Sequence, residues 1–391
     1  MRDLVHLAQE LENWRNAGTY QSLTILNSEQ GSQVEIGNQP SIQLSSNNYL
    51  GLTSHPAMKQ AAIEAIEEWG VGTGSVRTIA GTFSLHEQLE HELASFKQTE
   101  AALVFQSGFT ANVGVLASIL DERDVVISDE LNHASIIDGI RLTKAAKRIY
   151  RHVDLGDLER ALQENQQARI RLVVTDGVFS MDGDIAPLPE IVEQCEKYGA
   201  IIMVDDAHAS GVLGRQGRGT VDHFGLHGRV AIQVGTLSKA IGVLGGYVAG
   251  SQHLREYLIH RARPFLFSTS HPPSVTASCL KAIQLLQTEE HHIEKLWENT
   301  AFFKQGLLQL GFDIGVSKTP ITPIMIGNEA LAVQMSARLF KEGVYAKAIV
   351  YPTVSRGNAR IRTIVTAQHS IEELEKGIEM FAKVGKELEI I

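Results

Sequence analysis

The chain has 391 residues, of which 43% are apolar and 20% charged, a balance typical of a folded protein with about two or three structural units. Lys and Arg number 35 against 45 Asp and Glu, and a formal net charge of −10 excludes the basic surface that nucleic-acid binding requires. No apolar run approaches the roughly 20 residues of a membrane span, so no contact with a membrane is expected. The stretch Leu4 to Trp14 is acidic and amphipathic, unlike a secretion signal, and we expect a cytoplasmic protein.

The first clear helix is predicted from Pro56 to Gly70, where apolar residues recur every three or four positions between a proline and a glycine. Short β-rich runs then alternate with helical stretches such as Leu188 to Tyr198. Several runs are apolar throughout, as in strands buried on both faces of a parallel sheet. We therefore predict an N-terminal segment (1–45) and a large α/β domain (46–275) whose mostly parallel sheet is covered by helices. The predicted strands are Ala101 to Phe105, Val125 to Ser128, Leu172 to Thr175, Ala200 to Val204, Ala231 to Val234 and Gly246 to Ala249.

The pattern changes near residue 275, and we predict a second, smaller α+β domain over residues 276–391. A long helical stretch runs from Ser278 to Leu310. The last helix begins at Ser370 with Glu373 three residues later, the spacing of a capping box, and continues to Val384. Between these helices, strands are predicted near Ile324 to Ile326, Val344 to Val350 and Arg360 to Val365.

The cysteines and histidines form neither a disulfide framework nor a metal pattern. Cys195 and Cys279 are predicted to be reduced core residues, because neither has a cysteine or histidine at metal-binding spacing. His86 and His91 are five residues apart, whereas the zinc-protease helix needs a spacing of four. No metal site is expected.

Three polar groups fall at the predicted carboxyl ends of strands, where open α/β sheets bind ligands. Ser107 and Gly108 follow a strand and open a helix, so free backbone N–H groups there suit a phosphate, although a plain strand–helix turn has the same pattern. Asp205 follows a buried strand and needs a cationic or hydrogen-bonding partner. Lys239 lies in the turn after a later strand and is either a surface charge or, if desolvated, an amine that can form a Schiff base.

Together these groups match the requirements of pyridoxal 5′-phosphate (PLP): a phosphate cradle, an acid for the ring nitrogen and a lysine for the aldehyde. Asp205 would keep the ring nitrogen protonated, so that the ring accepts the electron pair left when a bond to the substrate α-carbon breaks. Lys239 would hold the cofactor and later move the α-proton. The sequence therefore predicts a PLP site.

Ordered blocks along nearly the whole chain resemble the α-oxoamine synthases, PLP-dependent acyltransferases of fold type I that include glycine C-acetyltransferase and 8-amino-7-oxononanoate synthase. The resemblance implies an aspartate-aminotransferase-like fold with a large sheet domain and a smaller C-terminal domain. The specific blocks are Ser46 to Leu52, Gly72 to Arg77, Ser107 to Asn112, Asn132 to Ser135, Asp205 to His208, Thr236 to Lys239 and Thr366 to His369.

The resemblance also implies roles for the matching residues. Lys239 matches the Schiff-base lysine, Asp205 the partner of the pyridine nitrogen and His133 the ring that stacks on the cofactor. Arg362 matches the clamp on the amino-acid carboxylate, which a planar guanidinium can hold with two parallel hydrogen bonds, and Asn47 assists it. The remaining matches are His208 and Ser180 near the phenolic oxygen, Ser107, Gly108, Phe109 and Thr236 at the phosphate, and Thr269, which in the family reaches the phosphate of the neighbouring subunit. A homodimer with shared active sites is therefore implied.

Some of these residues have plainer interpretations. His133 could be a core or capping histidine, and Ser180 could be only a turn residue. Arg360 is interpreted as a salt-bridge partner rather than a ligand-binding group. The glycines between Gly70 and Gly74 resemble a dinucleotide fingerprint, but they follow a helix instead of a strand, so no nicotinamide site is expected.

The resemblance implies condensation of a small amino acid with an acyl-CoA. Asn48 and the runs Leu131 to Gly139 and Arg263 to Ser268 favour glycine with acetyl-CoA, which would give 2-amino-3-oxobutyrate in threonine and glycine metabolism. Asp206-Ala207-His208 and Ser268-Thr269-Ser270 depart from the acetyltransferase pattern and leave two alternatives open. The first alternative is the reaction of biotin biosynthesis, in which alanine condenses with pimeloyl-CoA or pimeloyl-ACP and CO2 is lost. The second is an enzyme with a broad acyl specificity. A transaminase or aldolase would keep the lysine and aspartate but work without CoA, and a non-catalytic scaffold would normally lack the lysine.

Overall fold

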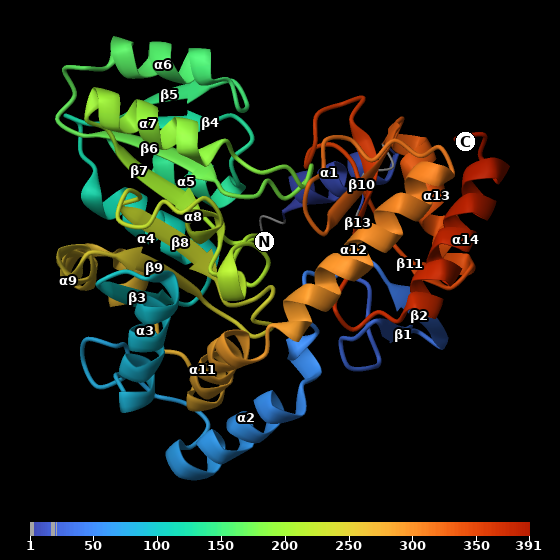
Figure 1. Cartoon of the computed structure of the whole chain (residues 1–391), viewed down its shortest axis with the longest axis horizontal. Helices are drawn as coiled ribbons and strands as arrows, with labels where there is room; N and C mark the ends of the chain where they lie inside the picture. The colour runs from blue at the N-terminus through green and yellow to red at the C-terminus, as the bar shows by residue number, and fades with distance from the viewer. Residues whose placement is uncertain (1–3, 17–19, 21) are drawn as a thin grey trace.

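The computed structural model describes residues 4–16, 20 and 22–391, so residues 1–3, 17–19 and 21 of the predicted N-terminal segment lie outside the description. A seven-stranded sheet of order β3-β9-β8-β7-β6-β4-β5 forms the centre of the larger part (Figure 1). Only β9 in this sheet runs antiparallel to its neighbours, which confirms the mostly parallel prediction. The strands are β3 (Ala101–Phe105), β4 (Val125–Asp129), β5 (Ala146–Tyr150), β6 (Arg171–Asp176), β7 (Ile201–Asp205), β8 (Ile232–Thr236) and β9 (Gly246–Gly250).

Helices cover both faces of this sheet, because successive side chains of a strand point to opposite sides. Leu103 of β3 packs with α4, α5, α9 and α10, whereas Ala102 and Val104 pack with α2, α3 and α11. Helices α6 and α7 cover the second face farther along the sheet. The helices are α2 (Pro56–Trp69), α3 (Ser84–Lys97), α4 (Gly108–Ile119), α5 (Ala134–Arg141), α6 (Leu155–Glu164), α7 (Leu188–Tyr198), α8 (Thr220–His223), α9 (Gln252–Arg261), α10 (Arg263–Leu266) and α11 (Pro273–Thr288), with short 3-10 turns at Leu52–Ser54 and Arg215–Gly217.

Strand β5 was not predicted from the sequence. It lies at the edge of the sheet, and its residues Ala146, Lys147 and Ile149 are exposed. An edge strand with charged side chains lacks the continuous apolar run by which the buried strands were recognised. The two cysteines, in contrast, are free and buried as predicted.

The C-terminal part of the chain has a separate three-stranded sheet of order β10-β13-β12, which packs against helices (Figure 1). The helical stretch predicted from Ser278 to Leu310 consists of two helices: α11 (Pro273–Thr288) ends at Thr288, and Glu289 leaves the helical conformation before α12 begins. Apolar periodicity continues through both helices and hides this break. The elements are α12 (His291–Gln309), β10 (Ile321–Gly327), α13 (Glu329–Lys341), β12 (Lys347–Ile349), β13 (Ala359–Ile364) and α14 (Ile371–Glu387).

The predicted strand over 344–350 is in fact two strands in different sheets. β11 (Val344–Tyr345) pairs with β2 (Gln39–Gln43), which also pairs with β1 (Gln33–Ile36), whereas β12 pairs with β13. The N-terminal segment thus packs with the C-terminal elements, and the domain boundaries after residues 45 and 275 stay a prediction. The predicted capping box of the last helix is confirmed, since Ser370 and Glu373 bond each other's backbone N–H groups.

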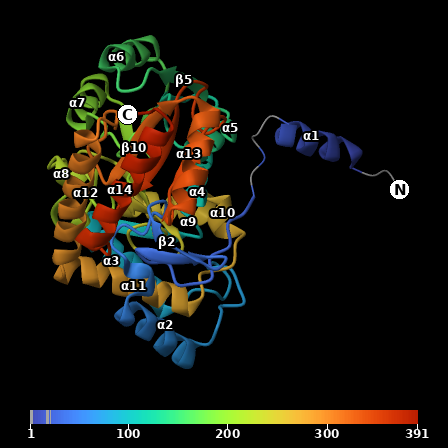
Figure 2. The ribbon, with the colours of Figure 1, turned by 90° about the vertical axis from the view of Figure 1, so that its right-hand side faces the viewer.

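Helix α1 (Val5–Asn16) stands apart from the rest of the chain (Figure 2), and none of its residues is buried. Among the described residues, no helix has both the length and the apolar character needed to span a membrane.

Candidate active site

A cavity of about 230 Å³ lies at the carboxyl ends of β6, β7 and β8, beside the beginning of α4. The predicted site residues that line it are Ser107, Gly108, Phe109, His133, Asp205, His208, Thr236 and Lys239. The sequence separates these residues by more than 130 positions, and the parallel strands bring them to one edge of the sheet.

The turn between β3 and α4 forms one wall of the cavity. Ser107 caps α4, because its Oγ accepts a hydrogen bond of 3.1 Å from the backbone N–H of Thr110. The turn lies so close to β9 that a Cβ on Gly246 would come within 2.4 Å of the backbone nitrogen of Gly108. The first N–H groups of a helix have no partner within that helix, so this turn offers donors to an anion. Thr236 lies next to Gly108 and adds a hydroxyl.

Asp205 forms the base of the cavity, and its carboxylate is held in place by two donors. Asn112 of α4 donates from Nδ2 to Oδ2 at 2.6 Å, and the backbone N–H of Ala207 donates to Oδ1 at 2.8 Å. Asn112 also bonds Ser135 Oγ, which contacts His133 Nδ1 at 2.7 Å. A continuous network therefore links Asp205 to His133. Sequence reasoning gave no role to Asn112 or Ser135, although a buried Asn in an otherwise apolar helix was a usable signal.

The next residue, Asp206, serves the scaffold instead of the cavity. It is fully buried, and Lys97 of α3 pairs with it at 2.8 Å with both side chains shielded from water. Thr220 donates to the same carboxylate from its backbone and its hydroxyl. A buried charge needs such compensation, so these bonds fix the chain directly after Asp205.

Two histidines of the cavity have pKa values below the usual value of a histidine, which favours their neutral form. Burial lowers the pKa of His133, with the positive charge of Lys239 acting in the same direction and the charge of Asp205 against it. Burial, and then the charges of Lys239, Arg362 and His133, lowers the pKa of His208 well below its usual range. Tyr49, which sequence reasoning did not single out, contacts His208 Nδ1 through its hydroxyl at 2.8 Å.

Lys239 projects into the cavity as a partly deprotonated amine. Burial lowers its pKa to about 8, and the negative charges of Asp205 and Asp176 oppose this shift. Asp176 ends β6 directly opposite Asp205 in the paired strands, and it also lines the cavity. Burial and the charge of Asp205 raise the pKa of Asp176 well above its usual value. Sequence reasoning missed Asp176, although it ends an apolar strand as Asp205 does.

Arg362 and Asn47 form a second polar group near this cavity. Arg362 of β13 donates from Nη2 to Asn47 Oδ1 at 3.1 Å. Its Nε is buried and has no partner among the described residues. A partly buried guanidinium with a free donor suits a carboxylate. The structure brings the two predicted residues together, although neither lines the 230 Å³ cavity itself. Arg360, in contrast, pairs with Asp182 at 2.5 Å, as the salt-bridge interpretation predicted.

Ser180 and Thr269 do not line the cavity within one chain. Ser180 lies in the turn after β6, just beyond Val178, which does line it. Thr269 is exposed, and its backbone carbonyl accepts a hydrogen bond of 2.9 Å from Gln106. The segment around Thr269 also pairs with Val76 through an isolated β-bridge.

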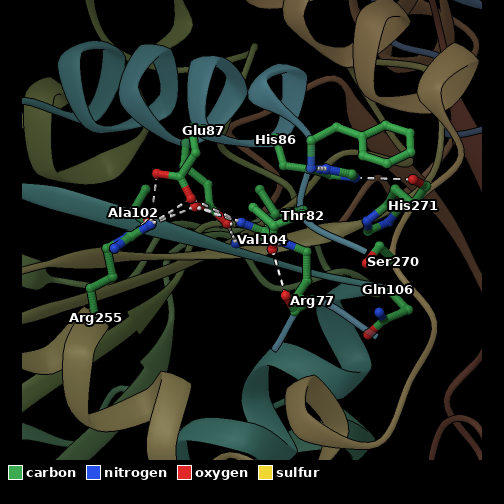
Figure 3. Close-up of polar contacts among 12 residues, drawn as sticks. Arg77, Thr82, His86, Glu87, Ala102, Val104, Gln106, Arg255, Ser270 and His271 are labelled. Carbon is green, nitrogen blue, oxygen red and sulfur yellow. Dashed lines mark hydrogen bonds and ion pairs between the residues drawn. The ribbon is translucent and has the colours of Figure 1, made fainter. Parts of the chain in front are cut away.

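A buried ion-pair network fixes the chain next to Val76 (Figure 3). Arg77 forms a two-pronged bond with Glu90, at 2.7 and 3.2 Å, and Arg255 reaches the same carboxylate at 2.9 Å. His86 contacts the backbone oxygen of His271 at 3.0 Å. These contacts hold the segment that presents Thr269 at the surface.

His152 joins two loops of the site. Its ring contacts Asp129, at the end of β4, and Asp184, in the turn after β6, each at 3.0 Å. Burial lowers the pKa of His152, but the hydrogen bonds to both carboxylates outweigh it and raise the pKa to about 10. Because this value exceeds that of an unfolded histidine, about 6.5, the stabilisation is complete below about pH 6.5 and is lost as the pH rises towards 10.

We therefore expect His152→Gln to lower the free energy of unfolding by about 2 kcal/mol at pH 6, after allowance for partial solvent screening. The difference from the unsubstituted protein should shrink as the pH approaches 10. Urea unfolding at both pH values measures it, with exposed His91→Gln as the control. A difference that stays constant with pH would contradict the assigned ion pairs.

The donor set of the cavity fits PLP. The helix turn offers N–H donors to a phosphate, the fixed carboxylate of Asp205 suits a protonated ring nitrogen, and Lys239 offers an amine for an aldehyde. The phosphate, the ring nitrogen and the aldehyde of PLP thus each have a chemically suitable partner among the residues of the cavity.

Comparison with known proteins agrees with this architecture. Residues 39–381 match the family model of class I and II aminotransferases. The chain is 64% identical to an 8-amino-7-oxononanoate synthase of Exiguobacterium sibiricum, over 99% of each chain, and 61% identical to 8-amino-7-oxononanoate synthase 1 of Bacillus subtilis, over 100% of each. A solved serine palmitoyltransferase from S. paucimobilis with PLP and myriocin bound superposes with a TM-score of 0.95 over 100% of both chains at 32% identity. An 8-amino-7-oxononanoate synthase structure from Francisella tularensis gives 0.76, at 29% identity over 90% of this chain and 99% of that one.

The fold and the site define a PLP-dependent enzyme of fold type I. Within that class the chain belongs to the class I and II aminotransferase family, and it is an α-oxoamine synthase, an acyltransferase. The expectation that the substrates are glycine and acetyl-CoA is not supported, because the similar relatives are named 8-amino-7-oxononanoate synthases. Of the features that favoured glycine, the run Leu131 to Gly139 contains His133 and Ser135, which line the predicted cofactor cavity, and residues at the cofactor do not report on the acyl donor.

Proposed function

We propose that the chain is an 8-amino-7-oxononanoate synthase that condenses L-alanine with a pimeloyl thioester of CoA or an acyl carrier protein and releases CO2. The observation that carries the proposal is identity of 64% and 61% over at least 99% of both chains to relatives of that name. Such a reaction belongs to the biosynthesis of biotin.

The α-carbon of alanine first loses its proton, and the electron pair of that C–H bond forms a new bond to the thioester carbonyl carbon. The C–S bond breaks, and the thiolate leaves and takes up a proton. The bond from the α-carbon to its carboxylate also breaks, CO2 leaves, and a proton replaces it on the α-carbon. PLP supplies a ring that stabilises negative charge at the α-carbon in these steps.

Residues in and near the cavity have separate roles in this reaction. Lys239, with a pKa of about 8, is partly a free base near neutral pH, so it can hold the cofactor and carry the α-proton. Asp205 would place a negative charge beside the ring nitrogen of PLP, and His133 would stack on the ring. Arg362 and Asn47 hold and orient the carboxylate of alanine.

The other predicted residues hold the cofactor in place. His208 and Ser180 lie near its phenolic oxygen in this proposal, and the chain acts as a homodimer. Ser107, Gly108, Phe109 and Thr236 would hold the phosphate, together with Thr269 of the neighbouring subunit.

The test is a substrate matrix on the purified PLP-loaded protein, with alanine or glycine against pimeloyl-CoA or acetyl-CoA and thiol release as the readout. We expect alanine with pimeloyl-CoA to be faster than every other pair by at least about tenfold. Faster turnover of glycine with acetyl-CoA would refute the proposal, as would amino-group transfer without thiol release.

A further inference from the structure

Lys347 and the carboxylate clamp Arg362 are neighbours in the C-terminal sheet. Lys347 of β12 lies directly opposite Arg362 of β13 in the antiparallel register. Opposed residues of such strands project to the same face, with Cβ atoms about 5 Å apart. Ala348, the next residue, packs on the C-terminal core on the other face. Lys347 and Arg362 therefore share the face that is turned towards the larger part of the chain.

Three cations lie on this face, and they differ in their partners. Arg360 is neutralised by Asp182, and Arg362 contacts Asn47. Lys347 is exposed, and no carboxylate of the described residues lies within ion-pair distance of it. Its Nζ lies 5.6 Å from the centroid of the Tyr345 ring. Lys347 is thus a second cation of this face, besides Arg362, that remains available to an anionic ligand.

Lys347 also lines a groove of about 760 Å³ between the N-terminal segment, α13 and β12. The walls combine apolar side chains, such as Leu23, Ile36, Val333 and Ile349, with hydroxyl-bearing residues such as Ser336 and Thr353. Lys347 is the one charged side chain among the described residues of the lining. A groove of this kind suits a ligand with an aliphatic chain and an anionic end, because the chain gains apolar contact and the end gains a charge-assisted hydrogen bond.

We propose that Lys347 binds the distal carboxylate of a dicarboxylic acyl donor. This inference rests on the proposed function, since an acetyl group has no second carboxylate. Arg362 holds the carboxylate of the amino acid, whose α-carbon attacks the thioester carbonyl. In a pimeloyl group the distal carboxyl carbon lies about 7–8 Å beyond that carbonyl. An extended lysine one strand away from Arg362 covers that span, so Lys347 sets the preference for donors with an anionic end.

The test compares two donors of the same length, pimeloyl-CoA and heptanoyl-CoA, which differ in the distal carboxylate. For Lys347→Gln we expect kcat/KM to fall about tenfold or more with pimeloyl-CoA and to change less than about twofold with heptanoyl-CoA. The KM for alanine should stay unchanged. Lys347→Glu should lower the rate with pimeloyl-CoA further. The matched control is Lys341→Gln, which removes an exposed lysine of α13 outside the groove.

The outcomes separate the inference from the proposed function. If the unsubstituted enzyme turns over pimeloyl-CoA but Lys347→Gln affects both donors equally or neither, the inference is overturned and the proposed function stands. If the unsubstituted enzyme turns over neither pimeloyl-CoA nor pimeloyl-ACP with alanine, the proposed function fails and the inference fails with it.

Discussion

Lys239→Ala is expected to abolish the covalent link to the cofactor and to lower turnover on the order of 10³-fold or more. Lys239 is the lysine that lines the cavity, and its pKa of about 8 makes it the amine poised for an aldehyde near neutral pH. Borohydride reduction followed by peptide mass analysis measures the link. The peptide that contains Lys239 should carry the reduced cofactor in the unsubstituted protein, and no peptide should carry it in the variant.

The matched control for this experiment is Lys144→Ala, which removes an exposed lysine far along the chain from the site. It should keep both the link and the activity. If the Lys239→Ala protein still gave a borohydride-stable link to another lysine, together with appreciable turnover, the assignment of Lys239 would be wrong.

The second large effect is expected for Arg362→Ala, which should raise the KM for alanine on the order of 100-fold. The side chain is partly buried, contacts Asn47 and has a buried Nε–H without a partner among the described residues, so its loss removes charge-assisted hydrogen bonds to the substrate carboxylate. Steady-state kinetics with varied alanine measures the effect. Cofactor content, read from the visible absorbance, should remain that of the unsubstituted protein.

Arg362→Lys serves as the conservative comparison. A single ammonium cannot donate two parallel hydrogen bonds, so this variant should recover only part of the lost affinity. An unchanged KM for alanine in Arg362→Ala would place the carboxylate site elsewhere on the chain.

Local sequence patterns predicted the buried part of the fold well. The strand ending at Phe105 and the helix from Leu188 to Tyr198 were predicted with the bounds that the structure has, because buried apolar runs and helical periodicity are local signals. The charged edge strand β5 and the break at Glu289 were missed. Both depend on where neighbouring elements pack, and such information is not present in a short window of sequence.

The candidate site shows the same division. The turns that carry Ser107, Asp205 and Lys239 were found from their place after strands, and the structure gathers them around one cavity. Asn112, Ser135 and Asp176 were not assigned, since their importance arises from contacts between separate elements. Lys347 was not singled out from the sequence either, because its position opposite Arg362 follows from the pairing of β12 with β13.

The most direct test of the central claim is the fate of the alanine carboxylate. The purified enzyme is incubated with alanine labelled in its carboxyl group and pimeloyl-CoA, and labelled CO2 and free thiol are measured together. A decarboxylating condensation predicts one CO2 for each thiol and an amino-ketone product that carries no label. Thiol release with the label retained in the product would contradict the account, and so would release of CO2 without thiol.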